Sequence, residues 1–299
     1  MQSLAPVVVF VLSFWTGVCL AQAPPTTSAL IEASLANADA NAKEAFSYTF
    51  HEDEANIIPH ISGDAPTPKL PGTQWAVPVF MVNAEYRWSI QRDVLFIEGI
   101  PYGRVTGING QKLSPEVAAS ESQRYDQAVV AIHALSPEQR LQRLKMPLGR
   151  ATIMMDPKQL TSAYNCKITG HEKVDKRPAT VIKCKPLPAL QKIDTATRMS
   201  GDVTLWVDDQ RPFLHRTRVV LDRPVGQYGR GTVFTDTWSL FDGVWHETSV
   251  ELDWVGSEET SKKVDAPGAH LDLEQVRKGR VVDTFSNFKK FRIESRIVP

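Results

Sequence analysis

Apolar and polar residues follow a helical period near the start of this chain and a strand period over most of the rest. Over residues 28–44 one stripe of apolar residues at helical spacing predicts an amphipathic helix: Leu30, Ile31, Leu35, Ala38 and Ala42. From Phe46 onward apolar residues recur at every second position, which predicts a strand. Residues 55–72 contain four prolines and two glycines, and we expect them to form a loop.

The signature Ser-Pro-Glu occurs twice and marks two helix starts. In Ser114-Pro115-Glu116, a capping serine precedes a proline and a glutamate that suit a first helical turn. We expect this helix to end near Leu135. Ser136-Pro137-Glu138 opens a second helix that ends before Pro147. Together the two helices form a helical insertion near residues 114–146.

The other segments are predicted as strands joined by short turns. Two strands, at residues 85–96 and 104–108, precede the helices, and Asn109-Gly110 is a turn signal after the second. Further turns are expected at Asp175-Lys176, Asp208-Asp209, Asp242-Gly243 and Lys278-Gly279. The strands expected around them lie at residues 203–207, 213–221, 232–241, 244–254 and 285–297. This order predicts an α+β fold that is mainly antiparallel β.

The strand at residues 244–254 indicates how the sheet is covered. The residues expected on one face are Val244, Thr248, Val250, Leu252 and Trp254. Glu247, Glu251 and Asp253 are expected on the other face. Such alternation is typical of an antiparallel sheet that is packed on one side and wet on the other.

The first 23 residues differ from the rest. An apolar run at residues 7–15 is followed by small residues up to Ala23, as in the hydrophobic region and cleavage zone of a signal peptide. No Lys or Arg precedes the run. The run is too short to span a bilayer, and no later segment approaches that length. We predict a signal peptide over residues 1–23, one domain over residues 24–299, and a periplasmic or secreted location.

Two cysteines remain after the signal peptide, Cys166 and Cys184. The segment between them is predicted as a hairpin that turns near Asp175-Lys176, which brings the two cysteines opposite one another. An exported chain with two facing cysteines favours a disulfide. Two buried free thiols are the alternative.

Composition and motifs exclude several classes of function. Lys plus Arg and Asp plus Glu both number 34, so the chain lacks the net basic charge that nucleic-acid binding normally requires. We find no Gly-x-Ser-x-Gly elbow, no phosphate-binding glycine loop and no dinucleotide fingerprint. The seven histidines do not pair at metal-ligand spacing. We therefore predict a non-catalytic protein without metal or cofactor; two carboxylates converging in a deep cleft would instead favour an enzyme.

Aromatic and aliphatic residues in the predicted strands are the remaining candidates for a binding site. They line either an ordinary core or the apolar cavity of a curved sheet, and periodicity does not separate the two. The candidate cavity residues are Trp88, Phe96, Trp206, Phe213, Phe234, Trp238, Val250, Trp254 and Phe291.

Several segments resemble the outer-membrane lipoprotein carrier (LolA-like) superfamily. Residues 204–218, with a Trp-hydrophobic-Asp core, resemble its strand-turn-strand element, and residues 234–251 resemble its following hairpin. Residues 109–115, 173–182 and 285–297 are similar to an uncharacterised family of exported bacterial proteins with the same half-barrel. The resemblance covers most of the mature chain, although the loop at residues 55–72 and the paired helices are not parts of the simple carrier fold.

The resemblance implies an incomplete, half-open β-barrel with helices against its concave face and an apolar cavity. It implies a carrier of lipid, lipoprotein or another hydrophobic ligand, by analogy of fold. The alternative is an envelope module of the same fold that binds a protein partner or acts as a sensor.

Overall fold

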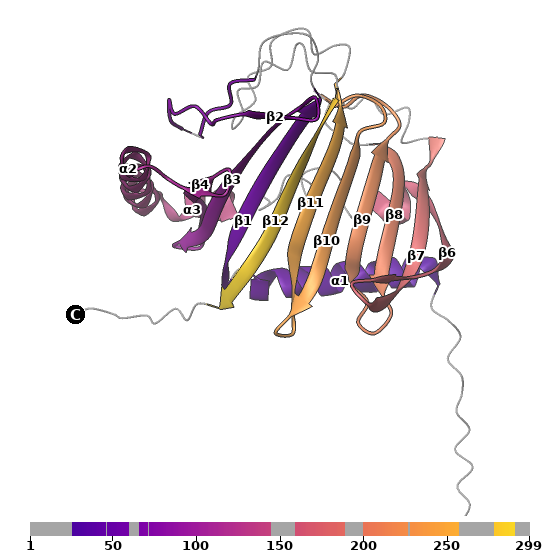
Figure 1. Cartoon of the computed structure of the whole chain (residues 1–299). Coiled ribbons are helices and arrows are strands. Elements are labelled where there is room, and N and C mark those ends of the chain that lie inside the picture. The colour runs from indigo at the N-terminus through magenta and orange to yellow at the C-terminus, as the bar shows by residue number, and fades with distance from the viewer. Residues whose placement is uncertain are drawn as a thin grey trace, which may run out of the picture.

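A 12-stranded antiparallel sheet curls into a half-open barrel and carries helices on its concave face (Figure 1). The computed structural model describes residues 26–45, 47–59, 66–70, 72–144, 159–188, 200–226, 228–256 and 278–290. The predicted signal peptide and Phe291 lie outside these residues. The α+β, mainly antiparallel fold expected from the sequence is confirmed.

The strands follow one another across the sheet with a single large jump in the chain. The order from edge to edge is β5 (Gln111–Lys112), β4 (Ile100–Ile108), β3 (Glu85–Ile97), β1 (Tyr48–Pro59), β12 (Lys278–Lys290), β11 (Val244–Val255), β10 (Val233–Phe241), β9 (Leu214–Leu221), β8 (Gly201–Asp208), β7 (Arg177–Pro186) and β6 (Tyr164–Val174). The short β2 (Phe80–Val82) also pairs with β3. β5 and β6 stand at opposite ends of this order, so among the described strands the barrel is open.

The jump occurs where β12 lies between β1 and β11. Two sequence predictions are wrong at this place. Residues 55–59 do not begin a loop but continue β1, because β3 pairs with them on one side and β12 pairs with residues 55–57 on the other. Lys278-Gly279 is not a turn but the start of β12, where Gly279 pairs with Trp254. A side chain at Gly279 would meet the Trp254 indole at 2.6 Å, so this glycine makes room for a neighbour.

Helix α1 (Thr27–Ala45) confirms the first predicted helix. It lies across the strands from β6 to β11 near one end of the sheet (Figure 1). Ile31 is 1% exposed and packs in the main core with Leu160 of the short α4 (Gln159–Ser162). Residues from both strands of the β8–β9 hairpin complete this core, among them Leu205 of β8 and Leu221 of β9.

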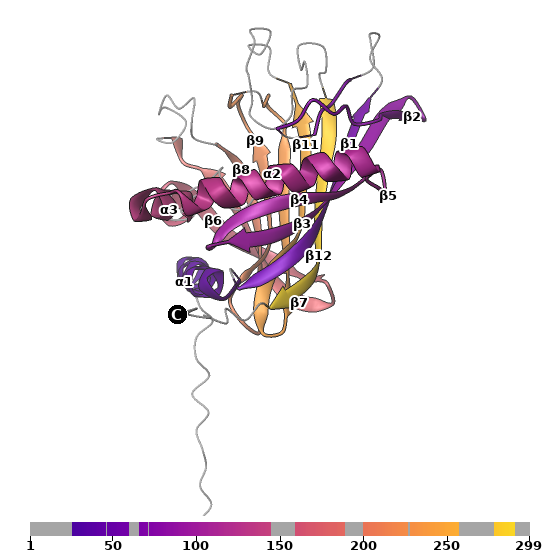
Figure 2. The same ribbon diagram turned by 90° about the vertical axis from the view of Figure 1, so that its left-hand side faces the viewer.

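Helices α2 (Pro115–His133) and α3 (Pro137–Leu144) begin at the two Ser-Pro-Glu signatures. The Ser114 side chain accepts a hydrogen bond from the Val117 backbone N–H, as expected of a capping residue. Both helices lie on the same side of the sheet as α1 (Figure 2), and α2 packs on β4. Within the described part of the chain, no helix has the length and apolar character needed to cross a membrane.

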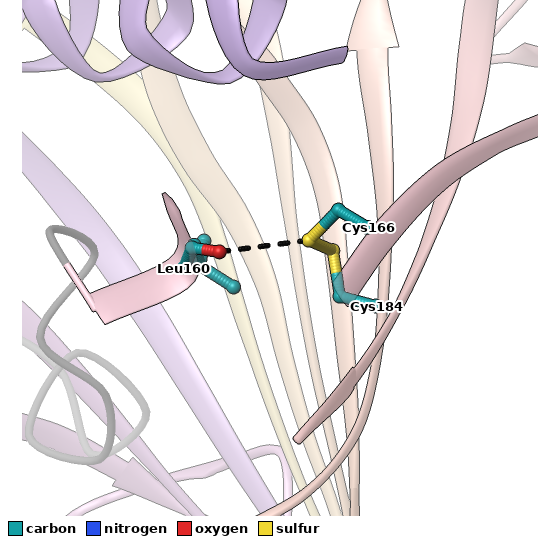
Figure 3. Close-up of a disulfide and its surroundings, with 3 residues drawn as sticks. All are labelled: Leu160, Cys166 and Cys184. Atoms are coloured by element: carbon teal, nitrogen blue, oxygen red, sulfur yellow. Dashed lines mark hydrogen bonds between the residues drawn. A yellow bond between two sulfur atoms is a disulfide. The ribbon is translucent and has the colours of Figure 1, made fainter. Parts of the chain in front are cut away.

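The predicted disulfide joins Cys166 of β6 to Cys184 of β7 (Figure 3). The two cysteines are directly opposite in the hairpin, which turns at Asp175 and Lys176 with φ of 47° and 68°. Sγ of Cys166 also lies 3.6 Å from the carbonyl oxygen of Leu160. A disulfide sulfur has no proton to donate, so this is a packing contact that places α4 beside the hairpin.

Candidate functional site

The helix-facing side of the sheet, which we call the concave wall, is apolar at its flanks and charged in its middle. Under α1, Phe234 and Trp254 are buried in one core with Ile31. Under α2, Trp88 and Ile90 are buried in a second core. The middle of the wall is formed by β10, β11, β12 and β1, which lie side by side (Figure 1).

Three acidic residues in the middle belong to one row across the strands. Asp236 pairs with Val250. Val250 pairs in turn with Asp283, which pairs with Glu54. Paired residues on neighbouring strands point to the same face of a sheet. Since Val250 is two residues from Leu252, a member of the main core, the whole row lies on the concave wall.

Glu247 reaches the same wall through a β-bulge. The register of β10 and β11 shifts between Thr237 and Trp238, which leaves Thr248 as an extra residue in β11. Simple alternation places Glu247 on the outer face with Glu251, and that prediction is wrong. The extra residue moves the alternation by one position and turns Glu247 inward.

Arg92 of β3 contacts Glu54, which belongs to this row, and Glu52, which lies two residues before it in β1. Its Nη1 donates to Oε1 of Glu52 at 3.2 Å, and its Nη2 lies 2.8 Å from Oε2 of Glu54. Nδ2 of Asn56 donates to Oε1 of Glu54 at 3.0 Å. Glu52, Glu54 and Asp283 each offer an oxygen within 4.8 Å of the others. We call the five acids the acidic cluster: Glu52, Glu54, Asp236, Glu247 and Asp283.

Burial and like charge both act on this cluster. Burial raises the pKa of Asp236 to about 7. Burial, with added repulsion from Asp236, Asp283 and Glu52, raises the pKa of Glu247 well above its ordinary value. Oδ1 of Asp236 and Oε1 of Glu247 are buried and have no hydrogen-bond partner among the described residues. Removal from water disfavours a carboxylate unless a cation or donors compensate, so both groups hold a proton at neutral pH more readily than free acids.

Five of the predicted cavity residues belong to the concave wall. Phe234 and Trp254 lie in the core under α1, and Trp88 lies in the core under α2. Val250 sits between Asp236 and Asp283 in the charged row, and Trp238 pairs with Glu247 beside it. Two of the predicted residues, Val250 and Trp238, therefore adjoin the acidic cluster, and the other three lie in the cores on its flanks.

The other described residues of this prediction belong to neither of the two cores. Phe213 is buried and stacks on Trp245, with ring centroids 4.7 Å apart. Phe96 is half-buried near the end of β3. Trp206 alternates with buried Leu205 and so faces away from the wall, where its Nε1 donates to Oε2 of Glu172 at 2.8 Å.

The Trp-hydrophobic-Asp motif ends in a buried structural ion pair. Asp208 is fully buried and accepts from Nε of Arg177 at 2.6 Å and from the backbone N–H of Gln210 and Arg211. Burial opposes its charge, but Arg177 and these donors lower the pKa of Asp208 below its ordinary value. The motif thus fixes the turn after β8, as expected for Asp208-Asp209.

The acidic cluster was not predicted from the sequence, although a signal for it exists. Asp236 stands at a period-two position between Phe234 and Trp238, within an apolar face. Asp283 stands in the same way between Val281 and Phe285. An acid in the middle of an apolar face is either buried with a partner or part of a site.

Comparison with known proteins identifies solved structures only. No protein-family model matches the sequence, and no curated protein is significantly similar to it. A DUF1329 family protein from Desulfovibrio piger is 12% identical, with 86% of this chain and 93% of that chain covered and a TM-score of 0.27. A LolA superfamily protein from Nitrosomonas europaea is 13% identical, with 88% and 97% covered and a TM-score of 0.28. A putative outer membrane lipoprotein-sorting protein domain from Vibrio parahaemolyticus is 10% identical, with 87% and 92% covered and a TM-score of 0.27.

These matches span most of both chains, at identities and TM-scores that say nothing about a shared ligand.

Proposed function

We propose that this chain is an extracytoplasmic, non-catalytic binding protein that holds a hydrophobic ligand, a lipid or a lipidated protein, on its concave wall. The observation that carries the proposal is the wall under α1, where aromatic and aliphatic side chains share one face and a single long helix covers them. That helix lies across the strands near one end of an open sheet (Figure 1), and the expected signal peptide agrees with a place outside the cytoplasm.

The apolar contact made by α1 is small enough for a lipid to replace. Ile31 is buried, and Leu30 and Leu35 pack partly against the same core. Fully burying such a side chain contributes about 1.5–3 kcal/mol, so the three contribute on the order of 5 kcal/mol. An acyl chain gains about 0.8 kcal/mol for each buried CH₂, or roughly 12 kcal/mol for about 16 carbons. A lipid chain can therefore displace the apolar part of α1 from the wall.

Hydrogen bonds hold α1 at its other end. Nδ2 of Asn41 donates to the backbone oxygen of Trp245 at 2.7 Å, and the Trp245 N–H donates to Oδ1 of Asn41 at 2.7 Å. Nδ2 of Asn37 donates to the carbonyl of Pro212 at 2.6 Å. Ile31 lies in the first half of α1 and these amides in the second. We propose that the first half swings away on ligand binding while the second half stays attached.

Lipid extraction and fluorescence quenching test this function. Native mass spectrometry of protein purified from its own envelope should show a bound lipid mass. A brominated fatty acid, which quenches nearby indoles, should quench the protein's fluorescence. The substitution Trp254→Phe, on the wall, should remove a larger share of that quenching than the substitution Trp206→Phe, on the outer face. Protein that carries no lipid from its envelope, and shows no quenching, would refute the proposal.

A protein partner is the second candidate, and one surface favours it. Phe80, Met81 and Val82, which form β2, are 53%, 58% and 43% exposed, and Trp75, a few residues before β2, is 40% exposed. Exposed apolar patches of this kind are typical of interaction sites. A photo-crosslinker is placed at Met81 in living cells. Capture of an envelope protein, together with the absence of bound lipid, would favour this function over the first.

The acidic cluster also bears on catalysis. Converging carboxyls with raised pKa values meet one condition for an enzyme, but a substrate must also reach them. Glu54, Asp236 and Asp283 are only 5%, 7% and 5% exposed. We therefore keep the non-catalytic proposal and seek another use for the cluster.

A further inference from the structure

We propose that the acidic cluster binds a hard divalent cation, with Ca²⁺ preferred and with Glu52, Glu54 and Asp283 as direct ligands. Such a site would exist on the middle of the concave wall whether or not a lipid binds under α1. It would also revise the expectation, drawn from the sequence, of a protein without metal.

The three carboxylates have the spacing that one calcium ion requires. One oxygen from each lies within 4.8 Å of the others. Ca²⁺ binds oxygens at about 2.3–2.6 Å, so two of its ligands are at most about 5 Å apart. Mg²⁺ binds at about 2.1 Å and needs its oxygens within about 4.2 Å. A separation of no more than 4.8 Å admits the larger ion as it stands, and a donor set made of carboxylate oxygens favours hard cations over zinc or copper.

Burial separates this group from the acidic patches that are common on protein surfaces. Glu54 and Asp283 are each 5% exposed. Taking a carboxylate out of water costs several kcal/mol unless opposite charge compensates. A divalent cation bound between these acids would supply opposite charge at a buried place.

Asp236 gives a second and independent indication of a ligand. It is 7% exposed, and its Oδ1 has no hydrogen-bond partner among the described residues. It points to the concave wall in the same row as Asp283, with Val250 between them. Because one strand separates the two acids, Asp236 reaches the ion through a water ligand and not directly. Calcium sites commonly complete their coordination with water in this way.

Arg92 positions two of the ligands. Its two terminal nitrogens contact Glu52 and Glu54 separately, which holds both carboxylates on one side of the site. A carboxylate oxygen carries two lone pairs, so each acid can contact the guanidinium and an ion together. Metal ligands are usually fixed by such outer contacts.

Terbium luminescence tests the site directly. Tb³⁺ substitutes for Ca²⁺ and emits strongly when a nearby indole is excited, and Trp238 pairs with Glu247 beside the cluster. The full mature chain is titrated with Tb³⁺ and then with Ca²⁺ as competitor. The variant is Asp283→Asn, and its matched control is Asp253→Asn. Asp253 is 54% exposed on the outer face of β11, where it contacts Arg280 at 3.5 Å.

We expect one Tb³⁺ to bind per chain in a saturable manner. Ca²⁺ should displace it more readily than Mg²⁺. Loss of an outer-shell partner weakens metal sites roughly 10–100-fold, so Asp283→Asn should weaken binding at least about 100-fold. Asp253→Asn should leave it within about twofold. The absence of saturable binding at millimolar Tb³⁺, or equal affinities in the two variants, would overturn the proposal.

Stability keeps the test decisive if a variant behaves unexpectedly. The Tm of Asp283→Asn without ions is measured beside that of the parent, which separates a loss of stability in the ion-free fold from a loss of ion binding. Ca²⁺ at about 100 times its Kd should raise the Tm of the parent by roughly 5 °C and leave that of the variant unchanged. If Asp283→Asn fails to fold, Glu52→Gln replaces it in both measurements, Tb³⁺ affinity and the Tm with and without Ca²⁺. A rise of the Tm with Ca²⁺ that persists in Glu52→Gln would contradict the site.

Discussion

Replacing His246 by phenylalanine should make the fold less sensitive to acid. The imidazole is 4% exposed, and its ring centroid lies 4.4 Å from those of Tyr48 and Phe288. Its Nε2 is buried without a hydrogen-bond partner among the described residues. Burial lowers the pKa of His246 from 6.5 to about 4. A phenyl ring keeps the aromatic packing and removes the group that must be protonated.

The sign and size of the effect follow from linkage. Between pH 6.5 and about pH 4 the unfolded imidazole binds a proton and the native one does not, so the free energy of unfolding falls as the pH is lowered through this window. At about pH 4.5, His246 lowers the free energy of unfolding by about 2.5 kcal/mol relative to its value at neutral pH. Other buried groups titrate too, since burial also lowers the pKa of His215. The difference between parent and variant isolates His246.

Urea unfolding followed by circular dichroism at about pH 7.5 and pH 4.5 provides the measurement. Between these two pH values, the free energy of unfolding of the parent should fall by about 2.5 kcal/mol more than that of His246→Phe. His171→Asn, at a position whose side chain is 70% exposed, is the control and should behave as the parent. Equal losses in the parent and His246→Phe would show that His246 is not a buried neutral histidine.

Three further substitutions probe other contacts. Asp208→Ala should destabilise the fold by about 3 kcal/mol in urea unfolding, because Arg177 and two backbone N–H groups lose their acceptor; a cost below about 1 kcal/mol would contradict this role. Replacing Cys166 and Cys184 together by serine should cost about 3 kcal/mol, since the disulfide closes a loop of sequence separation 18. As a control, the double-serine variant should be as stable as the parent protein whose disulfide has been reduced. Asn41→Ala should speed the uptake of a fluorescent fatty acid by releasing α1 from Trp245, whereas slower uptake would oppose a moving α1.

Local features of this chain were determined by its sequence alone. The capping of α2 by Ser114, the hairpin turn at Asp175 and Lys176, and the pairing of the two cysteines within that hairpin all depend on residues close together in the chain. Such features depend on backbone preferences and on short-range pairing, which a pattern of residues expresses directly. The mainly antiparallel fold follows from their sum.

Only the tertiary structure decided the position of β12 and the composition of the acidic cluster. β12 pairs with β1, more than 200 residues away, and no local pattern specifies such a partner. The cluster draws its acids from four strands, and one of them, Glu247, faces inward because the bulge at Thr248 shifts the alternation. A period of two assigns residues to opposite faces but does not reveal where an extra residue reverses the assignment, because that depends on the register with a neighbouring strand.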